Sequence, residues 1–268
     1  MEPKYEEQFT AFLDFLGFSE VSSTTDDTTR LKVLDLLLSL SALRGEFAVQ
    51  STAQESSKTS YIKPAISTFS DHIVISYPLQ PVSDEMESNE HLAAFVIMNQ
   101  FVRLLTSIAA AALRIGFLVR GGATIGKLYH ARGVVFGEAL VEAYQIESRT
   151  SIYPRVVLSP HITSRSRWKE NQLDIAKGDD GLYHFDYFKS LLFGAVPPGD
   201  SYAVAVRAWL DEVVRLVARN LTDLENGGRI NELAKWAWFA RQFRSGLEKL
   251  NPQMLTAFGI SLDAISWS

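Results

Sequence analysis

The N-terminal part of the chain passes from an apolar run to a helical period and then to a polar stretch. Phe9–Phe15 is apolar apart from one carboxylate and is followed by Gly17, a pattern that predicts a buried strand ending in a turn. Asp26–Leu43 carries leucine and valine at helical spacing behind an aspartate that can cap a helix, so it predicts a helix. Ala48–Ser60 is rich in Ser, Thr and Gln and predicts a loop.

A tight hairpin with an aspartate at its tip is predicted next. Ile62–Phe69 and His72–Tyr77 are both strand-like, and only Ser70 and Asp71 separate them. Glu90–Ile115 is rich in Ala and Leu and predicts a long helix that ends at the glycine after it.

Short strands around one helix are predicted for the following part. Phe117–Gly126 predicts a strand, and the Gly-Gly pair inside it indicates a close approach of another backbone. A strand, a helix and a strand are expected at Gly133–Phe136, Gly137–Glu147 and Pro154–Leu158. Strands joined partly by hairpins and partly by helices favour an α+β fold, with a ferredoxin-like antiparallel sheet flanked by helices, over a doubly wound parallel sheet.

The character of the sequence changes after the Pro-Pro pair at 197–198. Ala203–Leu224 and Arg229–Leu250 predict two helices separated by Asn-Gly-Gly at 226–228. We therefore expect an α+β domain over residues 1–195 and a helical C-terminal extension over 196–268, packed on that domain or on a second copy of the chain. Three tryptophans are expected to pack this extension and not to hold a cofactor: Trp209, Trp236 and Trp238.

Composition narrows the class of protein. The chain of 268 residues is 47% hydrophobic, and its formal net charge of −5 without a basic stripe argues against nonspecific nucleic-acid binding. It has no cysteine, which excludes disulfides and thiolate metal sites. The start is acidic and polar, unlike a secretory signal, and the apolar run Ile108–Val119 is interrupted by Arg114 and too short to span a bilayer. We expect a cytoplasmic protein that binds neither nucleic acid nor membrane.

Two aspartates carry the candidate chemistry. Asp14 lies at the end of the first apolar strand and Asp71 at the hairpin tip. A buried carboxylate without a partner is costly, so each needs a cation, a set of donors or a functional reason. If the two strands are neighbours, both carboxylates lie at one edge of the sheet, and two such oxygen ligands suit Mg²⁺ or Mn²⁺ and a phosphate substrate. The alternative is that each aspartate only caps a turn.

A short loop and one arginine are candidates for binding phosphates. The loop after Asp14 is Leu16, Gly17, Phe18 and Ser19, and small, flexible residues there let backbone N–H groups face an anion. Arg120 is a cation at the centre of an apolar strand. It is either a phosphate clamp, because a guanidinium binds phosphate oxygens in a bidentate way, or half of a structural ion pair.

These motifs resemble those of the class III nucleotidyl cyclases. Phe12–Ser19 (Phe-Leu-Asp-Phe-Leu-Gly-Phe-Ser) is similar to their first metal motif, an Asp followed by two residues and then Gly-Phe-Thr/Ser. Ser70-Asp71 resembles their second metal motif, in which Gly-Asp closes a β-hairpin. Val119–Gly122 with Gly126 is similar to the family strand that carries a phosphate-binding arginine. Val135–Val141 is similar to the strand and helix start that follow it. The resemblance covers about Phe9–Leu158.

The resemblance implies an activity, cofactors and a partner. Class III cyclases close a nucleoside triphosphate into a 3′,5′-cyclic monophosphate on two divalent cations, as homodimers with two active sites at the interface. One chain would supply Asp14, Asp71 and the Phe15 carbonyl to the metals. Arg120 would neutralise charge on the triphosphate. The other chain would supply groups that read the base and steady the transition state. The implied fold is the cyclase or palm-type form of the ferredoxin-like sheet.

The sequence departs from the family on the helix after the third motif. The family carries Asn and, four residues later, Arg, and the matching positions here are Val141 and Gln145. The charge of the transition state must then be met differently, and Gln145 or Arg149, one turn further along, are the candidates.

The positions that read the base also differ. The purine-reading Lys, four residues before the second metal Asp, corresponds to Ser67, and its Asp partner corresponds to Val134. An adenine or guanine pocket is therefore not supported. Ser67 and Thr68 are candidates for contacting the base, and because each can donate or accept a hydrogen bond, neither decides between uracil and cytosine.

A closer resemblance is to the pyrimidine cyclases of the bacterial Pycsar antiphage system, especially the uridylate cyclases. It rests on the stretches from Phe12, from Phe69 and from Val119 to Ser159, and on the length of a cyclase with a helical tail. It implies UTP as substrate and cyclic UMP as product, or CTP and cyclic CMP, made on infection to activate a separate effector. Two alternatives stay open: a catalytically silent cyclase-like module, and another two-metal phosphoryl-transfer enzyme on the same sheet topology.

Overall fold

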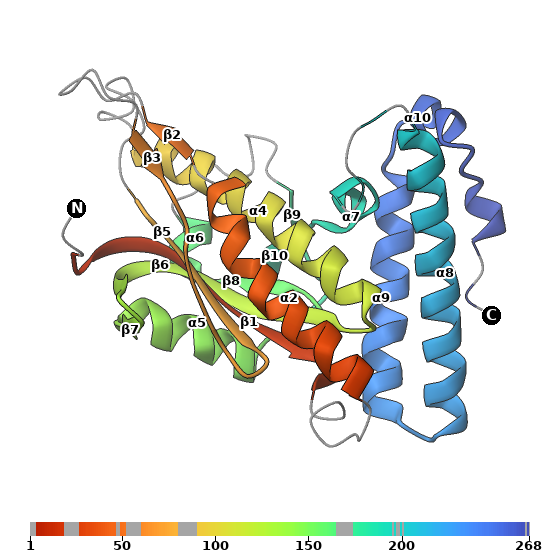
Figure 1. Cartoon of the computed structure of the whole chain (residues 1–268), viewed down its shortest axis with the longest axis horizontal. Helices are drawn as coiled ribbons and strands as arrows, with labels where there is room; N and C mark the ends of the chain where they lie inside the picture. Colours follow the sequence, from red (N-terminus) through yellow and green to blue (C-terminus); the bar gives the residue numbers. More distant parts are fainter. Residues whose placement is uncertain are drawn as a thin grey trace. The chain divides into compact units, whose positions relative to one another are not determined.

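The computed structural model describes residues 4–18, 27–46, 49–51, 60–79, 90–164, 174–194, 196, 199, 201–265 and 267. It divides into two compact units (Figure 1). The first unit contains residues 1–104 and 119–185, and the second contains residues 105–118 and 186–268. The boundary predicted between residues 195 and 196 stays a prediction.

The first unit is a β-sheet with helices on both faces. The strands of this sheet are β1 (Glu6–Leu16), β4 (Ala65–Phe69), β5 (His72–Pro78), β6 (Leu118–Ala131), β7 (Val134–Phe136), β8 (Val156–Leu158), β9 (Ile175–Lys177) and β10 (Tyr183–Phe185). A separate pair is formed by β2 (Val49–Ser51) and β3 (Ser60–Ile62). The helices are α2 (Asp27–Glu46), α4 (Glu90–Arg114, which continues into the second unit), α5 (Glu138–Arg149) and α6 (Pro160–Ser164).

The strand order confirms the predicted fold class. Within the described part of the chain the order is β4-β5-β1-β6-β8-β10-β9, with β7 paired to β6. The sequence β1, α2, β4, β5, α4, β6 with the spatial order β4-β5-β1-β6 is a ferredoxin-like unit. The sheet is mixed and not wholly antiparallel, because β6 pairs in parallel with β8 while β1 pairs antiparallel with β5.

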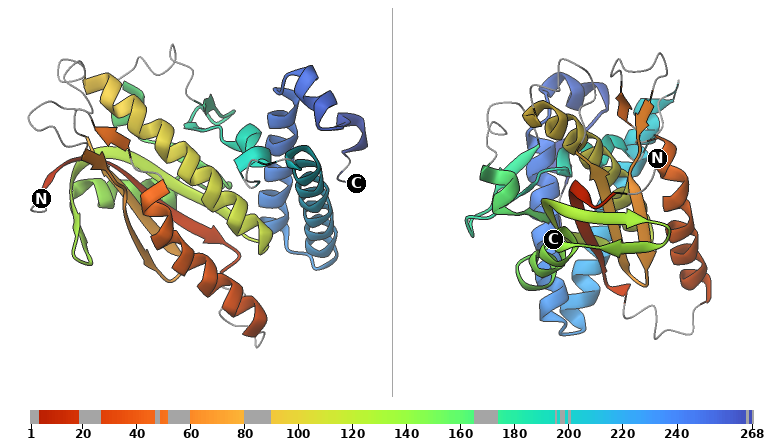
Figure 2. Two further views of the ribbon diagram at one scale, coloured as in Figure 1. Left: turned by 45° about the horizontal axis from the view of Figure 1, so that its top comes forward. Right: turned by 90° about the vertical axis from the view of Figure 1, so that its left-hand side faces the viewer.

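Strand β1 is buried on both faces, because helices cover both (Figures 1 and 2). On the face of α2 and of the first part of α4, the ring of Phe9 lies 4.8 Å from that of Phe101. On the opposite face, Phe12 packs with Val74 of β5 and Ala143 of α5. An apolar run without alternation is typical of a strand covered on both sides, which explains the pattern in the sequence.

The Gly-Gly pair of β6 does bring two backbones close together, as predicted. A Cβ atom at Gly121 would lie 2.5 Å from the carbonyl oxygen of Phe12, and one at Gly122 would lie 2.3 Å from the carbonyl oxygen of Ala143. Cβ atoms are essentially never found within 3.0 Å of a heavy atom that is not a covalent neighbour. Glycine at these positions therefore allows β1 and α5 to pack directly against β6.

Several predicted boundaries were wrong. The strand predicted at Ile62–Phe69 is broken at Lys63-Pro64, because proline cannot donate to a ladder. Residues 49–51 of the predicted loop Ala48–Ser60 form β2, and residues 52–59 lie outside the described residues. The strand predicted at Phe117–Gly126 runs on to Ala131. Strands β9 and β10 were not predicted.

The second unit is helical. With the last part of α4 it contains α7 (Phe188–Gly194), α8 (Tyr202–Asn226), α9 (Ile230–Glu248), α10 (Pro252–Ala257) and the 3₁₀ segment η1 (Leu262–Ala264). The Asn-Gly-Gly stretch separates α8 from α9 as predicted, and Gly228 has a φ of +66°, which favours glycine.

The tryptophans of this unit pack its core, as predicted. The indole N–H of Trp209 donates to the Leu191 carbonyl at 3.2 Å, and the Arg114 guanidinium lies 4.7 Å above the centre of the Trp209 ring system. Trp238 packs edge-on against Phe188 at 5.6 Å, and Trp236 against Phe239 at 6.1 Å. These rings bury large apolar areas, which is their usual contribution to a helical core.

Helix α4 is more apolar than the sequence analysis recognised. Among the described residues it is the one helix that is long and apolar enough, over Phe95–Arg114, to cross a membrane by length and composition. The prediction considered only Ile108–Val119 and so missed this. In the structure 67% of the stretch is buried. A buried core helix has the same composition.

Gly122→Ala should destabilise the fold, whereas Gly126→Ala in the same strand should not. A methyl group at residue 122 would meet the Ala143 carbonyl oxygen at 2.3 Å and the Glu147 backbone nitrogen at 2.9 Å, so α5 would have to move. Such overpacking typically costs about 1–3 kcal/mol. At Gly126 the nearest atom, the Cβ of Ala139, would be 3.4 Å away. Free energies of unfolding from urea titrations test this, and equal losses in the two variants would contradict the close approach.

Candidate active site

The two candidate metal aspartates lie at the ends of neighbouring strands, Asp14 near the end of β1 and Asp71 in the turn before β5. Antiparallel pairing of β1 with β5 places Asp14 directly opposite His72, the residue after Asp71. The Phe15 N–H donates to the Asp71 carbonyl at 3.2 Å, so Phe15 and Asp71 are a hydrogen-bonded pair. The adjacent Asp14–His72 pair is then of the non-hydrogen-bonded kind, in which opposite side chains lie closest. The strands are neighbours, as the metal hypothesis requires.

A strained turn presents Asp71. Phe69 pairs with His72, which leaves Ser70 and Asp71 as a two-residue hairpin turn, as predicted. Ser70 has a φ of +55°, and Asp71 does not have a positive φ. A positive φ at the first turn residue only is the pattern of a type II′ turn, in which glycine is favoured at that position.

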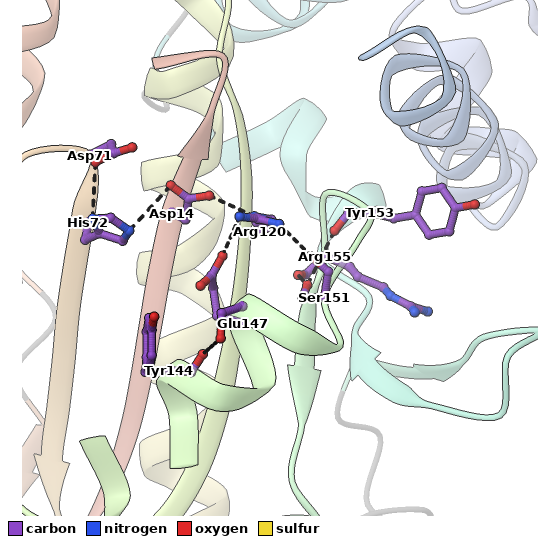
Figure 3. Close-up of polar contacts among 10 residues, drawn as sticks. Asp14, Asp71, His72, Arg120, Tyr144, Glu147, Ser151, Tyr153 and Arg155 are labelled. Atoms are coloured by element: carbon purple, nitrogen blue, oxygen red, sulfur yellow. Dashed lines mark hydrogen bonds and ion pairs between the residues drawn. The ribbon is translucent and has the colours of Figure 1, made fainter. Parts of the chain in front are cut away.

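His72 lies between the two carboxylates. Its Nδ1 is 3.2 Å from Asp71 Oδ1, and its Nε2 is 3.9 Å from Asp14 Oδ1 (Figure 3). One ligand atom from each of these three residues lies within 4.8 Å of the other two. No role for His72 was predicted from the sequence, although its place next to Asp71 and opposite the predicted strand of Asp14 was a usable signal.

The second oxygen of Asp14 is held by Arg120. The Arg120 Nε donates to Asp14 Oδ2 at 2.7 Å, and its Nη2 lies 2.8 Å from Glu147 Oε1 (Figure 3). A third contact runs from Nη1 to the carbonyl of Ser151 at 3.4 Å. The ion pair that was one of two interpretations of Arg120 is therefore present. A contact of Arg120 with phosphate stays a prediction.

Glu147 is a site residue that the sequence analysis missed. It is only 2% exposed and lies on the stripe of α5 that faces the sheet, with Ala139 and Ala143. Burial raises the pKa of the Glu147 carboxyl above its ordinary value, the Arg120 charge works in the opposite direction, and the Asp14 charge raises it further. The signal in the sequence was that Glu147 lies four residues after Ala143 and eight residues after Ala139, on the same helix face as these two small residues.

The predicted transition-state groups lie elsewhere on α5. Gln145 and Arg149 are exposed, and no contact within the described part of the chain joins them to Asp14, Asp71 or Arg120. Their roles stay predictions.

The predicted phosphate loop follows the end of β1. Leu16 is the last residue of the strand and is half-buried, and Gly17 has a φ of +99°, a conformation that glycine adopts without strain. Phe18 comes next, and Ser19 lies outside the described residues. The turn at Gly17 fits a loop that bends away from the strand beside Asp14, and its binding of phosphate stays a prediction.

The two candidate base contacts lie in different environments. Ser67 Oγ is 2.9 Å from Nε2 of His130, whose Nδ1 is 2.8 Å from Ser76 Oγ. Thr68 is exposed and, as the next residue of the strand, points to the other face of the sheet. Ser67 and Thr68 therefore do not face one ligand together. His130 and Ser76 were not recognised from the sequence, because the His130 side chain reaches both serines from more than 50 residues away along the chain.

The residues at this edge of the sheet fit a divalent cation. Asp14 is 6% exposed, its Oδ2 is bonded to Arg120, and its Oδ1 faces His72 and thus the side on which Asp71 lies. Carboxylate oxygens suit Mg²⁺ and Mn²⁺, and an imidazole nitrogen adds a ligand that transition metals accept.

Comparison with known proteins adds a distant likeness. No protein-family model and no curated protein matches the chain. The guanylate cyclase domain of RhGC from Catenaria anguillulae, in complex with GTP, is 15% identical over 67% of this chain and 94% of that domain, with a TM-score of 0.44. A bacterial light-regulated adenylyl cyclase is 12% identical over 69% of this chain and 52% of that protein, with a TM-score of 0.38. Similarity at this level does not assign an activity.

Replacing Glu147 should change how stability depends on pH. Because its pKa is raised in the fold, the contribution of Glu147 to stability is complete below its ordinary value of 4.5 and is lost as pH rises through the folded value. The free energy of unfolding of the wild type, relative to Glu147→Gln, should therefore fall as pH rises above about 4.5. Urea titrations across the acid range measure it. Glu138→Gln, exposed on the same helix, is the matched control, and parallel pH curves for wild type and Glu147→Gln would contradict the assignment.

Proposed function

We propose that the protein is a nucleotidyl cyclase that converts a pyrimidine nucleoside triphosphate, UTP in the first place and CTP in the second, into a 3′,5′-cyclic monophosphate and pyrophosphate. The observation that carries the proposal is that a carboxylate oxygen of Asp14 and one of Asp71 lie within 4.8 Å of each other, with Asp14 buried and oriented by Arg120. The cyclase-like motifs around these residues support it. The resemblance to the Pycsar cyclases supports a role as the signal generator of an antiphage defence system.

The chain would contribute positioning and charge to this reaction. Divalent cations held by Asp14, Asp71 and the Phe15 carbonyl would lower the pKa of the ribose 3′-hydroxyl and neutralise the leaving pyrophosphate. Because Arg120 holds Oδ2, the Asp14 carboxylate keeps its Oδ1 turned toward the cation side. The turn at Gly17 would direct backbone N–H groups toward the triphosphate.

The base would be read by a relay of three side chains. Ser76 is fully buried, and the contacts Ser76–His130–Ser67 form a chain in which the tautomer of His130 sets the direction of both hydrogen bonds. If Nε2 carries the proton, Ser67 accepts from it and its own O–H is free to donate, as uracil O4 requires. If Nδ1 carries the proton, Ser67 donates to Nε2 and offers a lone pair, as the cytosine amino group requires.

A homodimer fits the surface beside the site. Exposed apolar side chains gather on α5, on β7 and at the hairpin tip: Phe69, Val134, Phe136, Val141 and Tyr144, each at least 50% exposed. Such groups of exposed apolar residues mark interaction surfaces. Gln145 lies one helical turn after Val141, so in a homodimer Gln145 and Arg149 would face the active site of the partner.

A catalytically silent nucleotide-binding module is the second candidate. Val141 and Gln145 stand where cyclases carry Asn and Arg. The guanidinium of Arg120 is also already shared between Asp14 and Glu147.

Asp71→Asn should abolish turnover without unfolding the protein. The protein is incubated with each of the four nucleoside triphosphates and Mn²⁺, and the products are identified by mass. We expect a cyclic pyrimidine mononucleotide from the wild type and a loss of at least about 10²-fold in the variant, the effect of removing one charge-stabilising group. Asp179→Asn, at an exposed turn, is the control. Full activity in Asp71→Asn would refute the metal assignment, and no product from any nucleotide would favour the silent module.

Mixing two inactive variants should restore activity if Gln145 and Arg149 act on the partner. Asp71→Asn lacks a metal ligand, and the double variant Gln145→Ala/Arg149→Ala lacks the groups supplied to the other chain. A mixed dimer has one site with every group present, so random assortment should recover about a quarter of the wild-type activity. Mixing Asp71→Asn with Asp14→Asn should recover none. Mixed dimers without activity in the first pairing would show that these groups do not act across the interface.

A further inference from the structure

His72 occupies the position at which a third ligand would complete the cation site. Two ligand atoms on opposite sides of a cation with bonds of about 2.1 Å are about 4.2 Å apart. One ligand atom from each of His72, Asp14 and Asp71 already lies within 4.8 Å of the others. The separation of these three ligand atoms is therefore only slightly larger than the separation of ligand atoms around one bound cation.

The imidazole is held in this position by packing. His72 faces Asp14 across a close strand pair, and its ring is stacked on Phe69 at 5.4 Å. Phe12 also packs against the ring, at 5.1 Å, and lies 6.0 Å from Phe69. The His72 side chain is 30% exposed, so its outer edge remains open to solvent and ions. A ring already held by two aromatic neighbours loses little further freedom when it binds a metal.

The contacts of the ring favour the tautomer that binds metals. Nδ1 faces Asp71 Oδ1 at 3.2 Å, and Nε2 faces Asp14 Oδ1 at 3.9 Å. With its proton on Nδ1, directed at Asp71 Oδ1, the ring turns the lone pair of Nε2 toward Asp14. Asp71 would then have to bind the same cation through its other oxygen, Oδ2. Metal-binding histidines commonly donate their other N–H to a carboxylate in this way.

We infer that His72 is a third ligand, through Nε2, of the cation that Asp14 and Asp71 hold, an inference that rests on the proposed function. Mg²⁺ takes oxygen ligands, whereas first-row transition metals also accept imidazole. One nitrogen among the oxygens shifts the preference of the site away from Mg²⁺ and toward a transition metal such as Mn²⁺. His72 thereby sets the metal selectivity of the enzyme.

Pulsed EPR on bound Mn²⁺ tests this ligand directly. The full chain, without a polyhistidine tag, is loaded with Mn²⁺, and hyperfine coupling to a directly bound imidazole nitrogen is measured. His72→Gln places a neutral oxygen ligand near the position of Nε2. His161→Gln, whose histidine side chain is 65% exposed, is the matched control. Calorimetric titration with Mn²⁺ and Mg²⁺ gives the affinities, and thermal unfolding in EDTA checks that each variant folds.

The expected result is nitrogen coupling in the wild type and in His161→Gln, and its loss in His72→Gln. The Mn²⁺ affinity of His72→Gln should fall about tenfold or more, and its Mg²⁺ affinity by much less. Bound Mn²⁺ without nitrogen coupling in the wild type would overturn the inference and leave the proposed function standing. The inference and the proposed function would both be overturned if the wild type binds no Mn²⁺. They would also both be overturned if the Asp14→Asn and Asp71→Asn variants bind Mn²⁺ as well as the wild type does.

Discussion

The burial of the Asp14 carboxylate is the constraint on which the rest of the site depends. Asp14 ends an apolar strand and is 6% exposed, so its charge must be balanced by neighbours and not by water. Arg120 bonds one oxygen at 2.7 Å, and the other oxygen faces His72. In such surroundings electrostatic contacts are stronger than in water, and an unbalanced charge is more costly. Burial therefore raises the free-energy cost of the Asp14 charge. For the same reason it strengthens the binding of a cation to Oδ1, the oxygen that Arg120 does not hold.

The charges around Asp14 do not balance one another. Asp14, Asp71 and Glu147 are three carboxyl groups, and among the described residues Arg120 is the guanidinium in contact with two of them, Asp14 and Glu147. The raised pKa of Glu147 is one response to this excess of negative charge, since protonation there removes a charge that burial disfavours. A cation at Asp14 is another. Arg120 can hold Asp14 in place as an ion-pair partner and still leave the site with the negative charge that a divalent metal needs.

Local features of this protein could be predicted from its sequence, and long-range pairings could not. The apolar run of β1, the two-residue hairpin at Ser70-Asp71 and the close approach at the Gly-Gly pair depend on neighbouring residues, and all three were predicted correctly. The register that sets His72 opposite Asp14 is determined by the pairing of whole strands. The contact of Glu147 with Arg120 depends on how α5 lies on the sheet. Spacing along the chain places His72 beside Asp71 and Glu147 on the helix face of Ala139 and Ala143, but it does not give these contacts, and this is why His72 and Glu147 were missed.

Packing and electrostatics meet at the Gly-Gly pair. A Cβ atom on Gly122 would touch the turn of α5 that carries Glu147, at 2.9 Å from its backbone nitrogen. Because Gly122 has no side chain, that turn lies directly on the strand of Arg120, and Glu147 reaches the guanidinium at 2.8 Å. If α5 moved outward, Arg120 would lose one of its two carboxylate partners, and its hold on the Asp14 oxygen would change with it. The position of the Asp14 carboxylate thus depends on the lack of a side chain at Gly122 as well as on the charged residues themselves.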